Sequence, residues 1–267
     1  MRSKSRLYMP VVVVLLCLLL VAGCSQPDSP VASRDTLTQI STIDAILNGV
    51  YDGVMDFGTL KEYGDFGIGT FEALDGEMVA VDGDFYQVKA DGIAYPVTDD
   101  MLTPFASVTF FDVDEEASLP AGIDYNQLPA FMDGILPTEN TFCAIRIEGT
   151  FSYVKTRSVP AQEKPYPPLV EVTANQPTFE FNDVSGVIVG FLCPPYVAGV
   201  NVTGYHLHFL TDSRDAGGHV LEFTVAEAVI SIDYTSDFLM LLPGEGSDFY
   251  QLDLGQDKQG ELEEAEK

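Results

Sequence analysis

The stretch GYHLHFLTDSRDAGGH, residues 204–219, contains every histidine of this 267-residue chain. Its first part, YHLHFL, has the composition of a β-strand, and strand side chains alternate between faces, so His206 and His208 point the same way. TDSRDAGG then has turn composition, and HVLEF returns to strand composition. The stretch therefore predicts a β-hairpin with a loop of roughly six residues, in which His208 pairs near His219.

This pairing would place all three imidazoles on one face of the hairpin. Three nitrogen ligands and one open position for water or substrate are typical of a catalytic zinc site. Imidazole also suits copper, nickel and iron, but no carboxylate obviously joins the set, which favours zinc. A lone histidine is more often a surface residue or a satisfied core residue. The HxH pattern with a third histidine after Gly-Gly instead predicts that His206, His208 and His219 bind zinc.

Strand composition continues on both sides of the hairpin. Asp75-Gly76 and Asp82-Gly83 are turn dipeptides that divide residues 69–88 into short strands of hairpins. Further strands are expected within residues 106–113, 141–159, 178–194, 218–233 and 236–243.

Helical spacing is limited to a few segments. Apolar residues recur at helical intervals within residues 38–53, where Ser41 or Thr42 could serve as the N-cap. A second helix is expected within residues 118–136, after a proline, and residues 254–267 form either a short helix or a frayed tail. The sequence thus predicts an α+β (mixed α/β) fold with mixed β-sheets and few helices.

Four prolines fall within residues 160–168, which makes this segment the best candidate for a crossing between two parts of the globule. We expect an N-terminal β-rich half at residues 38–160 and a C-terminal β-rich half at residues 161–267, the latter carrying the metal site.

The N-terminus has the pattern of an export signal. Basic residues precede an apolar run over residues 11–22 that is too short to span a bilayer. Small residues then precede Cys24, as in a lipobox. We expect a lipoprotein signal at residues 1–23, a lipid anchor on Cys24 and a flexible tether at residues 24–37. The chain would then be exported and held at the cell envelope; an ordinary secreted protein and an uncleaved membrane anchor are the alternatives.

The formal charge of the chain is −28, and it becomes −31 without residues 1–23, because these carry three basic residues and no acidic ones. Such a charge excludes binding to the phosphate backbone of nucleic acids. An anionic substrate would need a local positive site. Beyond Cys24, the mature chain has Cys143 and Cys193, which could form a disulfide or remain free thiols.

Four blocks of sequence resemble the α-acetolactate decarboxylase family. They are GDFGIGTFEALDGEMVAVDGDFYQ, TPFASVTFF, FSYVKTRSVPAQEKPYPPL and GFLCPPYVAGVNVTGYHLHFLTDSRDAGGHVL. The resemblance covers nearly the whole predicted globule. It implies loss of CO2 from 2-acetolactate to give acetoin, with zinc bound by the three histidines, and a homodimer that associates through the N-terminal sheet. Members of this family are usually cytoplasmic, so the export signal is a departure.

The resemblance also assigns residues to the site. Glu77 in LDGE and Arg157 in KTRSVP match the family's catalytic or substrate-binding acid and arginine, and Thr70 lies near them. A glutamate at the end of the chain takes part in the family. Of the glutamates in LEEAEK, Glu266 is chosen because it is penultimate.

These residue types suit a decarboxylase. Arg157 would hold the substrate carboxylate, and Glu77 or Glu266 would protonate the enediolate. Two other functions remain open from the sequence: a surface lipoprotein that binds zinc without catalysis, and a metal-dependent hydrolase that uses the same three histidines.

Overall fold

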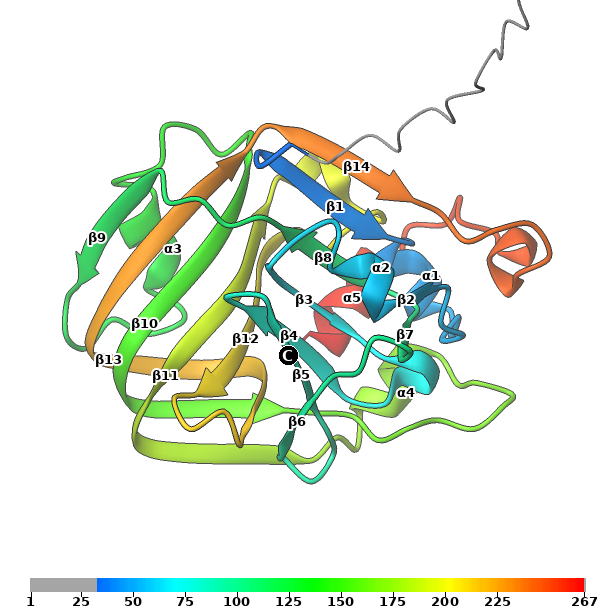
Figure 1. Cartoon of the computed structure of the whole chain (residues 1–267), viewed down its shortest axis with the longest axis horizontal. Helices are drawn as coiled ribbons and strands as arrows, with labels where there is room; N and C mark the ends of the chain where they lie inside the picture. The colour runs from blue at the N-terminus through cyan, green and yellow to red at the C-terminus, as the bar shows by residue number, and fades with distance from the viewer. Residues whose placement is uncertain (1–32, 267) are drawn as a thin grey trace, which may run out of the picture. The chain divides into compact units, whose positions relative to one another are not determined.

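Strands dominate residues 33–266, the part of the chain that the computed structural model describes (Figure 1). The predicted signal at residues 1–23, Cys24 and most of the tether at residues 24–37 lie outside the described part, so export and lipid anchoring stay predictions. The homodimer also stays a prediction. Within residues 33–266, none of the helices has the length and apolar character needed to cross a bilayer.

The first sheet is mainly antiparallel, with one parallel pair at its edge between β14 and β1. Its seven strands, in spatial order, are β14 (Asp237–Leu241), β1 (Thr36–Ile40), β8 (Ala106–Thr109), β3 (Phe66–Thr70), β4 (Glu77–Val81), β5 (Asp84–Val88) and β6 (Ala94–Pro96).

The second sheet is antiparallel and closes on itself, because its first strand also pairs with its fourth. Its five strands, in spatial order, are β10 (Phe142–Arg157), β11 (Thr178–Cys193), β12 (Gly204–Thr211), β13 (Gly217–Thr235) and β9 (Glu115–Leu119). Strands β10 to β13 therefore form a ring. A small third sheet pairs β2 (Met55–Asp56) with β7 (Leu102–Thr103).

The helices are short. They are α1 (Ile43–Leu47), α2 (Phe57–Leu60), α3 (Leu128–Met132), α4 (Leu169–Thr173) and α5 (Gln259–Ala265), with 3-10 turns at Glu72–Leu74, Pro195–Val197 and Asp248–Gln251. The side chain of Thr42 caps α1 by accepting a hydrogen bond from the Ala45 N–H.

Four apolar clusters hold these elements together. One of them packs α2 against the first sheet and consists of Ile40, Phe57, Leu60, Phe71, Met78, Ala80, Phe85, Ala106 and Val108. The ring core fills the inner face of β10 to β13 and consists of Leu119, Leu128, Met132, Cys143, Ile145, Ile147, Phe151, Val154, Ile188, Leu207, Phe209, Val220, Phe223, Val225, Ala228, Ile230 and Ile232. The inter-sheet core joins the two sheets and consists of Leu37, Phe66, Ile68, Val79, Val81, Val88, Ala94, Phe142, Ala144, Val187, Val189, Phe191, Cys193, Val197 and Leu210.

The fourth cluster, the helix core, brings α1, α4 and α5 together. It consists of Ile43, Ile46, Leu47, Tyr51, Leu74, Phe105, Val159, Leu169, Val172, Val202, Leu262 and Ala265. Helices of five to seven residues are too short to be stable alone, so this packing sustains them.

The fold class is confirmed, and so are most of the predicted strands. The helix predicted within residues 38–53 is wrong in its first part, because residues up to Ile40 form β1 and pair with both β8 and β14. The helix expected within residues 118–136 is reduced to α3. The division of the globule at residue 160 stays a prediction; in space, each of the two large sheets takes strands from both sides of that residue.

Cys143 and Cys193 are free thiols on opposite faces of the ring. Cys143 lies opposite Leu192 of β11, so these two side chains share a face and the next residue, Cys193, points the other way. Cys143 accordingly belongs to the ring core and Cys193 to the inter-sheet core. The alternative of free thiols, left open by the sequence, is therefore the correct one.

Asp233 is a buried carboxylate, and none of the described residues places a positive charge beside it. Asp233 is 1% exposed and accepts a 3.3 Å hydrogen bond from the Asp112 N–H. Burial raises its pKa to about 7, and Asp114, Asp35 and Asp112 add to the increase. The folded chain thus binds this proton more tightly than the unfolded chain, whose aspartate pKa is about 3.9. The free energy of unfolding is therefore not reduced by Asp233 at a pH below about 3.9. It falls as the pH rises from there toward 7, because the unfolded chain releases this proton first.

We expect Asp233→Asn to raise the thermal unfolding midpoint at pH 8, because the amide keeps the hydrogen-bond acceptor and removes the buried charge. The gain should shrink as the pH is lowered to 5. Thermal unfolding of both chains at several pH values measures the effect, with the exposed Asp84→Asn as the charge-matched control. A gain independent of pH, or one shared by Asp84→Asn, would contradict the prediction.

Candidate functional site

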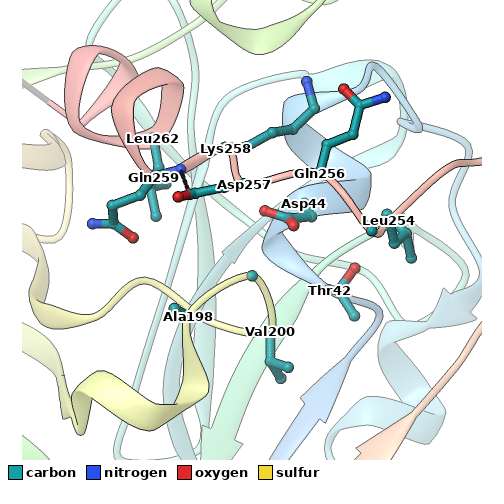
Figure 2. Close-up of a pocket in the computed structure, with 12 residues that line it drawn as sticks. Thr42, Asp44, Ala198, Val200, Leu254, Gln256, Asp257, Lys258, Gln259 and Leu262 are labelled. Atoms are coloured by element: carbon teal, nitrogen blue, oxygen red, sulfur yellow. Dashed lines mark hydrogen bonds between the residues drawn. The ribbon is translucent and has the colours of Figure 1, made fainter.

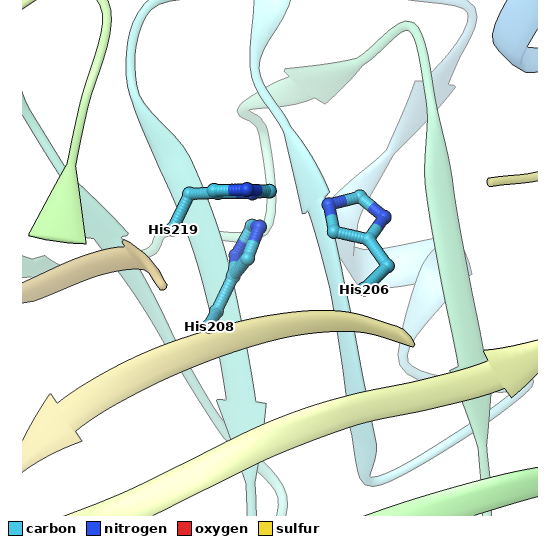
Figure 3. Close-up of side chains that lie close together, drawn as sticks. All are labelled: His206, His208 and His219. Atoms are coloured by element: carbon cyan, nitrogen blue, oxygen red, sulfur yellow. The ribbon is translucent and has the colours of Figure 1, made fainter. Parts of the chain in front are cut away.

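The three histidines converge on the outer face of the ring, where it meets the first sheet (Figure 3). His208 of β12 is the register partner of His219 of β13, and Leu210 pairs with Gly217, so the loop between them has the predicted length. His206 lies two residues before His208 on the same strand, so its side chain points to the same face. The ring centroids are 5.1–5.3 Å apart. The hairpin and the common face predicted from the sequence are confirmed.

The packing of β12 against β4 sets the orientation of His208. Its Nδ1 lies 2.7 Å from the Met78 carbonyl oxygen, and an N–H at Nδ1 donates to that oxygen. This bond leaves the lone pair on Nε2, which has no hydrogen-bond partner among the described residues. Burial lowers the pKa of His206 to about 3 and holds the pKa values of His208 and His219 well below the usual range. All three imidazoles are therefore neutral at neutral pH, the form that binds metals.

Glu77 and Arg157 form a buried ion pair beside the histidines. Glu77 begins β4 and Arg157 ends β10, and an Arg157 N–H donates to Glu77 Oε1 at 2.6 Å. Their side chains are 7% and 5% exposed. Burial raises the pKa of Glu77 to about 7; Arg157 opposes this shift and Glu266 adds to it. The second oxygen of Glu77 lies 3.6 Å from His208 Nε2.

Glu266 reaches the site from the C-terminal helix. It follows α5, whose Leu262 and Ala265 are buried in the helix core. Its carboxylate lies 3.4 Å from His219 Nε2, 3.8 Å from His206 Nε2 and 3.7 Å from Arg157. The contacts to the histidines are not ion pairs, because both imidazoles are neutral. Burial raises the pKa of Glu266, and Arg157 opposes the increase.

Thr70 lies next to Glu77 but is engaged in the turn. It ends β3 as the register partner of Glu77, and its hydroxyl donates to the Gly76 carbonyl oxygen at 2.7 Å. Thr70 therefore holds the residue that precedes Glu77, while its side chain borders the same cavity. The structure thus brings together all seven residues predicted for the site.

One cavity of about 40 Å³ is lined by five of these seven residues, and His206 is the one histidine among the five. Glu77, Arg157, His206 and Glu266 form its polar part. Its apolar wall consists of Ile43, Ile46, Leu74, Phe105, Val159 and Leu169. The sequence did not reveal this wall, because its members come from five separate segments that meet only in the folded chain. The one sequence signal for this wall is the helical spacing of Ile43 and Ile46. That spacing predicts a buried helix face but does not identify what the face contacts.

The donor set fits a divalent metal ion. Each histidine offers one nitrogen, and the three nitrogens lie within 4.8 Å of one another. Among the described residues, His208 Nε2 and His219 Nδ1 have no hydrogen-bond partner although both are buried. An unsatisfied buried polar atom costs about 1–3 kcal/mol, and a bound cation would satisfy both lone pairs. One guanidinium faces two carboxylates here, so a divalent cation would also turn the local charge balance positive.

Comparison with known proteins gives a consistent result over most of the chain. Residues 37–256 match the sequence profile of the family described as alpha-acetolactate decarboxylase. The chain is 54% identical to the alpha-acetolactate decarboxylase of Methanosarcina mazei, over 90% of this chain and 83% of that protein. It is 42% identical to the alpha-acetolactate decarboxylase of Bacillus subtilis strain 168, over 88% of this chain and 90% of that protein.

The fold comparison agrees with the sequence comparison. The crystal structure of alpha-acetolactate decarboxylase from Bacillus subtilis strain 168 superposes with a TM-score of 0.84 at 41% identity. The match covers 86% of this chain and 99% of that one.

We expect the purified chain to bind divalent metal through its histidines, and His208→Ala to lose it, because this removes the nitrogen that the Met78 carbonyl orients. Elemental analysis after dialysis measures the metal content. Tyr205→Phe, on the same strand, is the control and should retain metal. Equal metal content in His208→Ala and the parent chain would refute the assignment.

Proposed function

The chain belongs to the alpha-acetolactate decarboxylase family, and from this premise we propose that it converts 2-acetolactate to acetoin and CO2 with zinc as its metal. The observation that carries the proposal is the cluster of three neutral imidazoles, two carboxylates and one guanidinium, of which His206, both carboxylates and the guanidinium line one cavity. Metal storage alone would need neither the carboxylates nor the guanidinium.

The substrate is a β-keto acid, so the bond to the carboxylate breaks with its electron pair left on the carbon. The neighbouring ketone accepts this pair, which gives an enediolate. Zinc held by His206, His208 and His219 would supply Lewis-acid stabilisation of the charge that develops on the ketone and hydroxyl oxygens. Neutral imidazole ligands leave the full charge of such an ion available for this purpose.

Arg157 is the residue that recognises the substrate carboxylate. It is the local positive group that an acidic chain needs to accept an anion. Glu77, Glu266 and the Ala265 carbonyl oxygen fix the two terminal nitrogens, at 2.6, 3.7 and 3.4 Å. Its Nε is buried and has no hydrogen-bond partner among the described residues, so one donor of the guanidinium remains available. Burial strengthens its attraction for a carboxylate.

The proton that completes acetoin comes from one of the two cavity carboxylic acids. Burial raises the pKa of both Glu77 and Glu266, so each holds a proton more readily than an exposed glutamate. A pKa near the working pH is what a general acid requires. The apolar wall keeps water away from the enediolate, so protonation comes from the positioned acid.

We expect the purified chain without residues 1–23, supplied with zinc, to produce acetoin from racemic 2-acetolactate. A colorimetric acetoin assay with a metal-free sample as the control measures this. Bound zinc with no acetoin would reject the decarboxylase and leave the zinc-binding protein. Hydrolysis of ester substrates without acetoin would support the hydrolase.

We expect Glu77→Gln to retain zinc and to lower kcat by about 10²–10⁴-fold, the usual contribution of a general acid or base. The amide keeps the shape of the side chain but cannot donate a carboxyl proton. Metal content and acetoin formation are measured on the same samples. Glu72→Gln, an exposed glutamate in the preceding turn, is the control. Full activity of Glu77→Gln would show that this carboxylate has no part in the chemistry.

A further inference from the structure

The N-terminal ends of α1 and α5 line a second cavity (Figure 2). Its volume is about 400 Å³, which is in the range of small-molecule sites. Residues 198–200 form one wall, the start of α1 forms another, and residues 254–259 with Leu262 complete it. None of the residues proposed for the decarboxylase borders this cavity.

Asp44 is the distinctive residue of the second cavity. Its side chain lines the cavity although the residue is only 8% exposed, and Figure 2 shows its carboxylate turned toward residues 256–258. Among the described residues, no hydrogen bond or ion pair within bonding distance engages this carboxylate. Gly199 leaves room for it, because a Cβ there would lie 2.9 Å from Asp44 Oδ2. A buried carboxylate without a partner is costly unless a ligand compensates it.

The charges around Asp44 favour a cation. Lys258 is the positive charge that acts on it, but the Lys258 ammonium is bound to Glu261 at 2.8 Å. Asp257 and Glu261 add negative charge to the same surroundings. Burial, the largest cause, raises the pKa of Asp44, and Lys258 opposes this increase.

We propose that the second cavity binds a small organic primary ammonium ion, with the ammonium on Asp44 and an alkyl part against apolar side chains. The side chains of Val200, Leu254 and Leu262 line the cavity and suit a short alkyl chain. The volume exceeds what a bare metal ion needs, which favours the organic cation. Thr42, whose hydroxyl caps α1, and Gly199 also line the cavity.

Binding at this cavity would act on the C-terminal helix. Residues 256–259 border the cavity, and α5 continues from them to Glu266 in the first cavity. Helix α1 also contributes to both cavities, since Asp44 borders the second cavity while Ile43 and Ile46 border the first. An ammonium ion on Asp44 would therefore stabilise the segment that carries Glu266.

The test uses n-butylammonium chloride as the probe at constant ionic strength. At about tenfold above its dissociation constant it should raise the thermal unfolding midpoint by roughly 3–6 °C, and isothermal titration should give saturable binding. Sodium chloride and sodium butyrate are the controls and should give neither effect. Absence of binding, or an equal effect of butyrate, would overturn the proposal whether or not the chain makes acetoin.

Two variants with opposite expectations locate the site. Asp44→Asn should weaken binding at least about tenfold, because it removes the charge that pairs with the ammonium. Lys258→Gln should strengthen binding roughly threefold, because it removes the competing positive charge. Unchanged affinity in Asp44→Asn overturns the proposal. If Asp44→Asn does not fold, Lys258→Gln decides: unchanged or weaker affinity rejects the site.

Hydrogen–deuterium exchange tests the link to α5. With n-butylammonium bound, amides of residues 259–266 should exchange at least about threefold more slowly in the parent chain and not in Asp44→Asn. Protection that is equal in the two chains would contradict the link between the second cavity and Glu266.

Discussion

The hydrogen bond between His208 Nδ1 and the Met78 carbonyl oxygen connects the two sheets at the point where the site forms. It requires β4 of the first sheet to lie against β12 of the ring, and it leaves His208 Nε2, the nitrogen nearer Glu77, with the lone pair. The same contact of sheets places Glu77, the residue before Met78, beside the histidines. The inter-sheet core therefore does more than stabilise the fold, because a shift of one sheet would separate the acid from the imidazoles.

Burial of the charged site residues is unfavourable, and contacts between opposite charges offset this cost. Removing one partner of a buried ion pair typically costs about 3–5 kcal/mol, so Arg157 and Glu77 depend on each other. Glu266 and the Ala265 carbonyl oxygen share the remaining contacts of Arg157. The hydrogen bonding of the histidines is incomplete, since two of their nitrogens lack partners among the described residues. The chain thus leaves unsatisfied the groups that a metal ion would satisfy.

The sequence predicted the local part of this site well and the long-range part only through resemblance. Strand alternation and the Gly-Gly turn suffice to pair His208 with His219, because both constraints act within one hairpin. No local pattern connects Glu77 with Arg157, 80 positions apart, and the resemblance supplied that link. The strand at residues 36–40 was missed because its apolar spacing continues into α1; pairing with β8 and β14, which local periodicity cannot show, decides its structure.

Glu266 illustrates how the end of the chain becomes part of the interior. The match to the family model ends at residue 256, and Glu266 lies beyond it, directly after α5. Helix α5 has seven residues and no side-chain N-cap, and it is held by Leu262 and Ala265 in the helix core. Such a helix has little stability of its own. Whatever strengthens its packing against α1 and α4 therefore also fixes the carboxylate beside His219 and Arg157, which makes the cavity around Asp44 a natural place from which the site can be influenced.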